Sequence, residues 1–152
     1  LKQLMYLERE RPGEPVTMYI NSPGGEVASG LAVFDYIGVM ESPVNTVCIG
    51  SAASMGAILF LAGKERSILR NSEIMIHDPS FSTGDIGGKK PFEIQEKLNQ
   101  LMSVRDKLSK IIAERTGMTE EEVCRRTKTD SYLNAQEALE LGIATKIIEK
   151  EK

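Results

Sequence analysis

The feature that most constrains this chain is an apolar run that stops at a glycine and resumes after a few small residues. Residues 44–49 are mostly apolar, Gly50 follows, and residues 55–62 are again apolar enough to be buried. We expect a buried strand, a tight turn and a buried helix, with Ser54 at the start of the helix. A hydroxyl there would lie beside free backbone N–H groups and the positive end of the helix dipole. Serine is also a favoured N-cap, and because caps are commoner than active sites, this stretch alone favours a structural cap over a nucleophile.

The residues before this stretch predict a strand and a helix. Residues 16–20 are typical of a strand, 21–25 of a turn rich in glycine, and 27–40 have the spacing of an amphipathic helix. With the strand at 44–49 they form a βαβ unit, whose strands should be parallel and whose connection should be right-handed. The first ten residues look like the end of a helix, and we expect that a segment preceding Leu1 is missing.

The rest of the chain continues the alternation of strands and helices. We expect short strands at 66–69 and 73–76, a loop or flexible arm at 80–90 and a long helix at 91–115 that begins with proline. A capping box at 119–122 should open a helix to about Thr127, followed by a helix at 135–141, a strand at 143–148 and a frayed tail at 149–152. This order predicts an α/β layered fold.

Composition narrows the class of protein. The length of 152 residues predicts a single domain over 1–152, and a net charge of −3 gives no electrostatic reason to expect nucleic acid as a partner. The longest apolar run is far shorter than the roughly 20 residues that a membrane helix needs. Two cysteines and one histidine predict neither a disulfide framework nor a zinc site, and no glycine-rich nucleotide motif occurs. The cytoplasm is therefore the expected compartment, with no metal and no organic cofactor.

Two turns follow the strands of the βαβ unit and should lie side by side. Ligands bind at the carboxyl ends of parallel strands, and these turns carry Gly24 and Gly25 in one case and Ser54 and Met55 in the other. Glycines let backbone N–H groups face a cleft without a side chain in the way. The N–H groups of Gly25 and Met55 are therefore candidates for an oxyanion hole beside the Ser54 hydroxyl.

The only histidine, His77, follows the strand expected at 73–76 and is the candidate general base for Ser54. A carboxylate should orient its ring. Asp78 is adjacent in sequence, but neighbouring residues of an extended chain point to opposite sides. Asp130, in a polar loop, ranks only slightly above the alternatives Asp85 and Asp106.

Other nucleophiles and bases are weaker candidates. Cys48 lies in an apolar strand and Cys124 on the capped helix, where cysteine usually packs as a small hydrophobe. Lys64 could serve a serine–lysine scheme, but it follows the far end of the helix that begins at Ser54, about 15 Å away at 1.5 Å per residue.

Several motifs, taken in order, resemble the proteolytic subunit of the Clp protease. They are Tyr-Ile-Asn-Ser-Pro-Gly-Gly at 19–25, Ser-Ala-Ala-Ser-Met-Gly at 51–56, Met-Ile-His at 75–77 and Asp-Ser-Tyr-Leu-Asn-Ala-Gln-Glu-Ala at 130–138. The resemblance extends from about Leu4 to Ile148. It implies the ClpP/crotonase fold, a spiral of βαβ units with a helical extension.

The resemblance also implies a function and a set of roles. Ser54 would be the nucleophile, His77 the base, Asp130 the orienting carboxylate, and the N–H groups of Gly25 and Met55 the oxyanion hole. The chain would be a serine endopeptidase acting on unfolded polypeptide inside two stacked seven-membered rings. An AAA+ unfoldase of the Clp family would use the ATP and deliver the substrate.

The sequence departs from the family pattern in three places. We expect the family's N-terminal axial segment to be missing before Leu1. The arm at 80–90 lacks the usual Gly-Gly-Tyr element, and Asp78 stands where glutamine is usual. Two rival functions remain as alternatives. One is a crotonase-type enzyme acting on acyl-CoA, which shares the paired N–H groups but typically uses glutamates. The other is a catalytically silent ring subunit.

Overall fold

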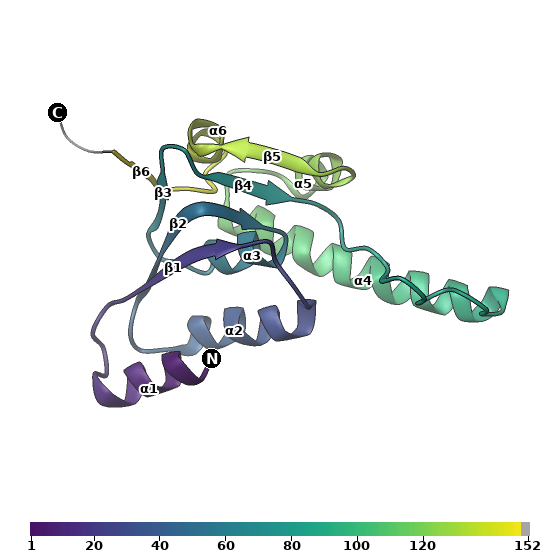
Figure 1. Ribbon diagram of the computed structural model, residues 1–152, viewed down its shortest axis with the longest axis horizontal. Coiled ribbons are helices and arrows are strands. Elements are labelled where there is room, and N and C mark those ends of the chain that lie inside the picture. Colours follow the sequence, from purple (N-terminus) through teal and green to yellow (C-terminus); the bar gives the residue numbers. More distant parts are fainter. Residues whose placement is uncertain (150–152) are drawn as a thin grey trace.

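The computed structural model describes residues 1–149, so the last three residues of the expected tail lie outside the described part. A curled sheet forms the centre of the molecule, as Figure 1 shows. Helices α1, α2 and α3 lie on one side of it, and the long helix α4 extends well beyond the body. The arrangement is a mixed α/β fold whose sheet forms a half-barrel, consistent with the ClpP/crotonase fold.

The elements follow one another along the chain in the order that the sequence patterns predict, with one additional strand. They are α1 (Lys2–Glu10), β1 (Val16–Ser22), α2 (Val27–Val39), β2 (Val44–Ala53), α3 (Met55–Leu61), β3 (Arg66–Leu69), β4 (Glu73–Ile76), α4 (Pro91–Arg115), α5 (Glu120–Thr127), β5 (Ser131–Asn134), α6 (Ala135–Glu140) and β6 (Lys146–Ile148).

Strand β2 is the centre of the sheet. Its first half pairs in parallel with β1 and with β3, and its second half pairs in parallel with β4. Between the halves, Gly50 has φ +92 and the register with β1 shifts after Ile20. A glycine with positive φ is typical of a bulge, which bends the strand. The expected βαβ unit is confirmed, but its second strand continues past Gly50 to Ala53 instead of ending there.

Helix α3 packs beneath β2 and is almost entirely buried. Six of its seven residues are buried, and Phe60 and Leu61 have no exposed surface. Helices α2 and α4 cover it, and the main core cluster includes residues of α3, β2, β4 and α4. Burial of this many apolar side chains fixes the end of β2 and the start of α3 relative to the rest of the sheet.

Three local expectations need correction. Strand β5 was not expected, and it pairs antiparallel with β4 at the edge of the sheet. Strand β6 is shorter than the predicted 143–148. Only half of the capping box at 119–122 forms, because the Thr119 hydroxyl accepts the Glu122 N–H while the Glu122 carboxylate pairs with Arg126.

Candidate active site

Three neighbouring strands bring Ser54, His77 and Asp130 together at the end of the sheet where β2 and β4 finish and β5 begins. Ser54 follows β2, and its N–H donates to the carbonyl of Met75 on β4 at 2.9 Å. His77 directly follows β4, whose last residue Ile76 pairs with the first residue of β5. Asp130 directly precedes β5, so the antiparallel register continues with His77 opposite Asp130. The sheet order β5-β4-β2 therefore sets the order carboxylate, imidazole, hydroxyl.

The three side chains form a hydrogen-bonded chain. The Ser54 Oγ lies 2.9 Å from Nε2 of His77, and Nδ1 of His77 lies 3.2 Å from Oδ1 of Asp130. A carboxylate on Nδ1 favours the tautomer whose proton is on Nδ1, which leaves Nε2 free to accept a proton from the hydroxyl. The His77 side chain is 27% exposed and that of Asp130 is 57% exposed, so solvent reaches the carboxylate end.

The backbone of Ser54 is strained. It has φ 54 and ψ −122 and is the one non-glycine residue with positive φ in the described part of the chain. A side chain in such a conformation costs on the order of 1–3 kcal/mol. Ser54 occupies the N-cap position of α3, yet its side chain makes no capping hydrogen bond. The hydroxyl that could have capped the helix instead faces His77.

The glycine turn after β1 lies directly against this strained residue. A Cβ atom added to Gly24, which has φ +99, would lie 2.7 Å from the Cβ of Ser54 and 3.1 Å from the N of Met55. The N–H of Gly24 donates to the Ser22 hydroxyl at 3.1 Å. Within residues 1–149, the N–H groups of Gly25 and Met55 donate to no protein acceptor. Both amides are therefore available to a ligand beside Ser54.

A small apolar pocket of about 30 Å³ opens next to the hydroxyl and the imidazole. Its walls come from α2, α3, β4 and α4, through Val27, Ile58, Ile76 and Leu108 among others. The Ser54 hydroxyl and the His77 imidazole thus have polar neighbours on one side and a small apolar hollow on the other.

The alternative carboxylates lie elsewhere. Asp78 pairs with Arg105 of α4 at 2.9 Å, and Asp106 lies 3.7 Å from the same guanidinium. Asp85 accepts the N–H of Ser82 within the arm. None of the three contacts His77, so the structure brings Asp130 alone of these candidates to the imidazole.

The alternative nucleophile Cys48 is enclosed in the core. It has no exposed surface, and burial raises the pKa of its thiol to about 11. A thiol that remains protonated at neutral pH is a poor nucleophile. Lys64 lies beyond the opposite end of α3, where its N–H donates to the carbonyl of Val44.

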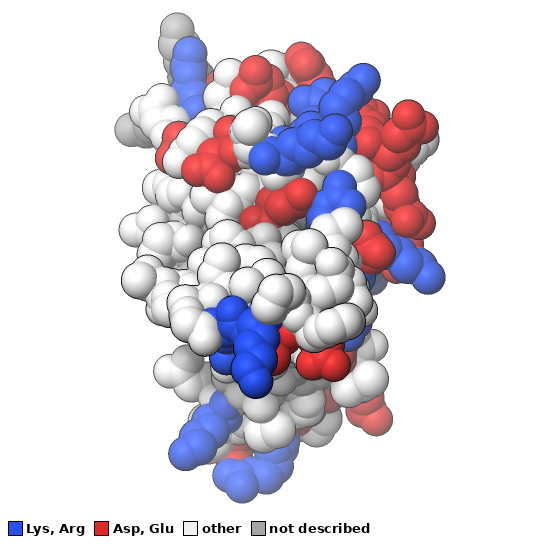
Figure 2. Space-filling view, turned by 90° about the vertical axis from the view of Figure 1, so that its right-hand side faces the viewer, with Lys and Arg blue, Asp and Glu red and all other residues white. Residues whose placement is uncertain are grey.

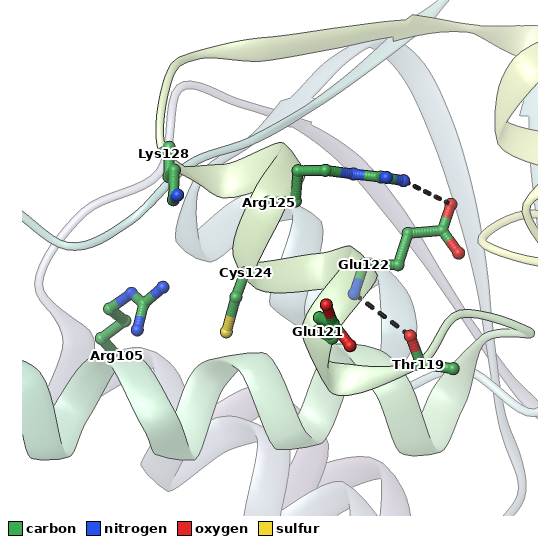
Figure 3. A pocket seen from close by; sticks show the side chains of 7 residues that line it. All are labelled: Arg105, Thr119, Glu121, Glu122, Cys124, Arg125 and Lys128. Atoms are coloured by element: carbon green, nitrogen blue, oxygen red, sulfur yellow. Dashed lines mark hydrogen bonds and ion pairs between the residues drawn. The ribbon is translucent and has the colours of Figure 1, made fainter.

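A larger pocket lies away from this site. It measures about 660 Å³, lies between α4 and α5, and is lined by charged and polar side chains, as Figure 3 shows. Its lining includes none of Ser54, His77 and Asp130.

Acidic and basic side chains are interspersed around a broad uncharged area on the face that Figure 2 shows.

The described helices include none with both the length and the apolar character to cross a membrane.

In a comparison with known families, the family model described as Clp protease matches residues 1–151.

Proposed function

The chain belongs to the Clp protease family, and we propose that it is a serine endopeptidase whose reaction is carried by Ser54, His77 and Asp130. The observation that supports these roles is the hydrogen-bonded chain from the Ser54 hydroxyl through the His77 ring to the Asp130 carboxylate. Family membership suggests a serine peptidase. The hydroxyl, imidazole and carboxylate of this site lie in the order that a serine nucleophile, its base and an orienting group would need.

In the proposed mechanism, Oγ of Ser54 attacks the carbonyl carbon of the scissile peptide bond. Nε2 of His77 accepts the hydroxyl proton and then transfers it to the leaving amine. Water hydrolyses the resulting acyl-enzyme by the same route, and the hydroxyl of Ser54 is regenerated. Asp130 keeps the ring in the required tautomer and stabilises the imidazolium while it carries the proton.

The N–H groups of Gly25 and Met55 are the proposed oxyanion hole. Met55 is buried, and its lack of a protein acceptor supports this role because a buried donor normally has a partner. Gly25 is exposed, so its N–H is open to a ligand from the solvent side. Each donor to the tetrahedral oxyanion is worth roughly 3–4 kcal/mol of transition-state stabilisation in comparable sites.

We further propose that the chain works in two stacked seven-membered rings in the cytoplasm, and that an AAA+ unfoldase delivers unfolded polypeptide. Helix α4 supports the assembly, because it projects from the body and carries exposed apolar side chains. Phe92 is 87% exposed and Leu98 is 40% exposed. Apolar side chains on a projecting helix are a typical contact surface between subunits.

The proposal is tested with a fluorogenic peptide that carries an apolar residue before the fluorophore, and with a fluorophosphonate label for activated serine. Wild type should cleave the peptide and take up one label per chain, and Ser54→Ala should do neither. Sizing of both proteins should give the mass of two seven-membered rings. If wild type assembles but neither cleaves nor becomes labelled, the protein is a silent ring subunit and the enzymatic function is wrong.

A further inference from the structure

Asp78 connects the segment that carries His77 with the segment that carries Asp130. It directly follows His77, and its N–H donates to the carbonyl of Thr127 at 2.7 Å. Thr127 is the last residue of α5 and precedes Asp130 by three positions. The backbone of Asp78 therefore joins the segment after β4 to the segment that leads into β5.

The side chain of Asp78 reaches a third element, helix α4. Its Oδ2 accepts from Nε of Arg105 on α4 at 2.9 Å, and the two side chains are only 28% and 19% exposed. Figure 3 shows Arg105 rising from α4 toward α5, close to Cys124 and on the same side as Lys128. The hydrogen bond to Asp78 raises the pKa of the Arg105 guanidinium, which favours an ionised pair. A half-buried ion pair of this kind is screened less than an exposed one.

The carboxylate of Asp130 has few other constraints. Its side chain is more than half exposed, and its only described polar contact with a side chain is the one with His77. Its position thus depends on the backbone that holds β5 against β4 and on the anchor at Thr127. The same anchor and the Arg105 pair also limit the movement of His77, since Asp78 is its neighbour in the chain.

We propose that Asp78 and Arg105 are positioning residues, and that their ion pair fixes the segment after β4 to α4 so that the His77 ring stays between Ser54 and Asp130. This inference rests on the proposed peptidase function. Neither residue touches the reacting atoms. Their contribution is to the alignment of the base, and small displacements of a base reduce rates steeply.

Loss of the pair should lower the rate of the chemical step and leave substrate binding unchanged. We expect Asp78→Asn and Arg105→Met each to reduce kcat for the fluorogenic peptide, and the rate of fluorophosphonate labelling of Ser54, by on the order of 10-fold. KM should stay the same. The double variant should be no slower than the slower single variant, because both changes remove the same interaction. Arg105→Lys keeps a charge within reach of Asp78 and should recover most of the rate.

Arg126→Met is the matched control. Arg126 pairs with Glu122 at 3.1 Å, with side chains 33% and 30% exposed, but this ion pair lies within α5 and joins it to no other element. This variant removes an arginine from a pair of similar exposure and should keep the wild-type rates. Active-site titration gives the rate per labelled site, so a variant that is partly unfolded is still compared correctly.

The outcomes separate the inference from the function on which it rests. If wild type cleaves and is labelled but Asp78→Asn and Arg105→Met match Arg126→Met in kcat, the positioning role is wrong while the peptidase function stands. A rise in KM at constant kcat, or a lower melting temperature with an unchanged labelling rate per site, overturns it equally. If wild type is no more active than Ser54→Ala, the peptidase function fails and this inference fails with it.

Discussion

Gly24→Ala should test how closely the glycine turn and the strained serine depend on each other. The added methyl group would have to adopt φ +99 and would lie 2.7 Å from the Cβ of Ser54 and 2.8 Å from the carbonyl oxygen of Ala53. A side chain at positive φ costs about 1–2 kcal/mol, and overpacking of a close contact typically adds about 1–3 kcal/mol. We therefore expect the free energy of unfolding to fall by about 2–5 kcal/mol in total.

Gly13→Ala is the control that separates the two effects. Gly13 has φ +78, but a Cβ there would meet nothing within 4 Å. The free energy of unfolding of this variant should fall only by the cost of a side chain at positive φ, about 1–2 kcal/mol. Urea denaturation, followed by circular dichroism at one fixed protein concentration, measures both values, since assembly makes stability depend on concentration.

The same variants should differ in activity. Gly24→Ala can relieve the contact only if the turn or Ser54 moves, and a shift of about 1 Å at a reacting group can cost on the order of 100-fold in rate. Labelling of Ser54 by the fluorophosphonate should therefore slow strongly in Gly24→Ala and remain at the wild-type rate in Gly13→Ala. Equal losses of stability in the two variants, together with a wild-type labelling rate in Gly24→Ala, would refute this reasoning.

Three further predictions follow from the site and the core. Ser54→Gly and Ser54→Ala should both be inactive, but the glycine variant should be more stable by about 1 kcal/mol in urea denaturation because it relieves the strain at φ 54; equal stability would contradict that strain. Asp130→Asn should lower kcat by on the order of 10²–10⁴-fold with little change in KM, since an amide favours the wrong tautomer of His77; a wild-type kcat would exclude Asp130 as the orienting group. The pKa of the Cys48 thiol is raised from 9.0 to about 11 by burial, so the neutral thiol contributes stability that is complete below pH 9 and is lost as the pH rises toward 11. Unfolding curves at pH 8, 9, 10 and 11 should show this loss in wild type and a smaller one in Cys48→Ala; parallel declines would contradict it.

Elements with strong local signals could be predicted from the sequence in detail. Helix α4 runs from Pro91 to Arg115 as expected, because proline favours a first helical position and Gly117 follows the last turn. Strands β3 and β4 also have their expected bounds. In these segments the local preference and the tertiary structure agree, so the pattern alone was sufficient.

Strand β5 could not be predicted, and the uncertainty about the carboxylate followed from this. Its four residues include polar Ser131 and Asn134, and its stability comes from pairing with β4 at the edge of the sheet. Without that pairing, the local sequence places Asp130 only slightly above Asp85 and Asp106. The resemblance to the Clp protease family favoured it clearly, and the register of β4 with β5 supplies the physical reason for its position.

The positive φ of Ser54 could not be predicted from local sequence preferences either. The sequence predicted a helix start, where serine prefers to cap, and no propensity indicates positive φ for serine. Tertiary contacts impose it: the N–H of Ser54 is held by Met75, the buried helix α3 begins one residue later, and Gly24 packs against it from the adjacent turn.

The pairing of β5 with β4 has a consequence for the order in which the protein becomes competent during synthesis. A chain that leaves the ribosome from its N-terminus presents Ser54 and His77 well before residues 130–134 exist. Until those residues emerge, the edge of β4 has no partner and the imidazole has no carboxylate. Pairings between segments far apart in sequence also form late in folding. A nascent or truncated chain therefore carries Ser54 and His77 without Asp130, and we expect the proposed hydrolytic activity only after the segment that begins at Asp130 has folded onto the sheet.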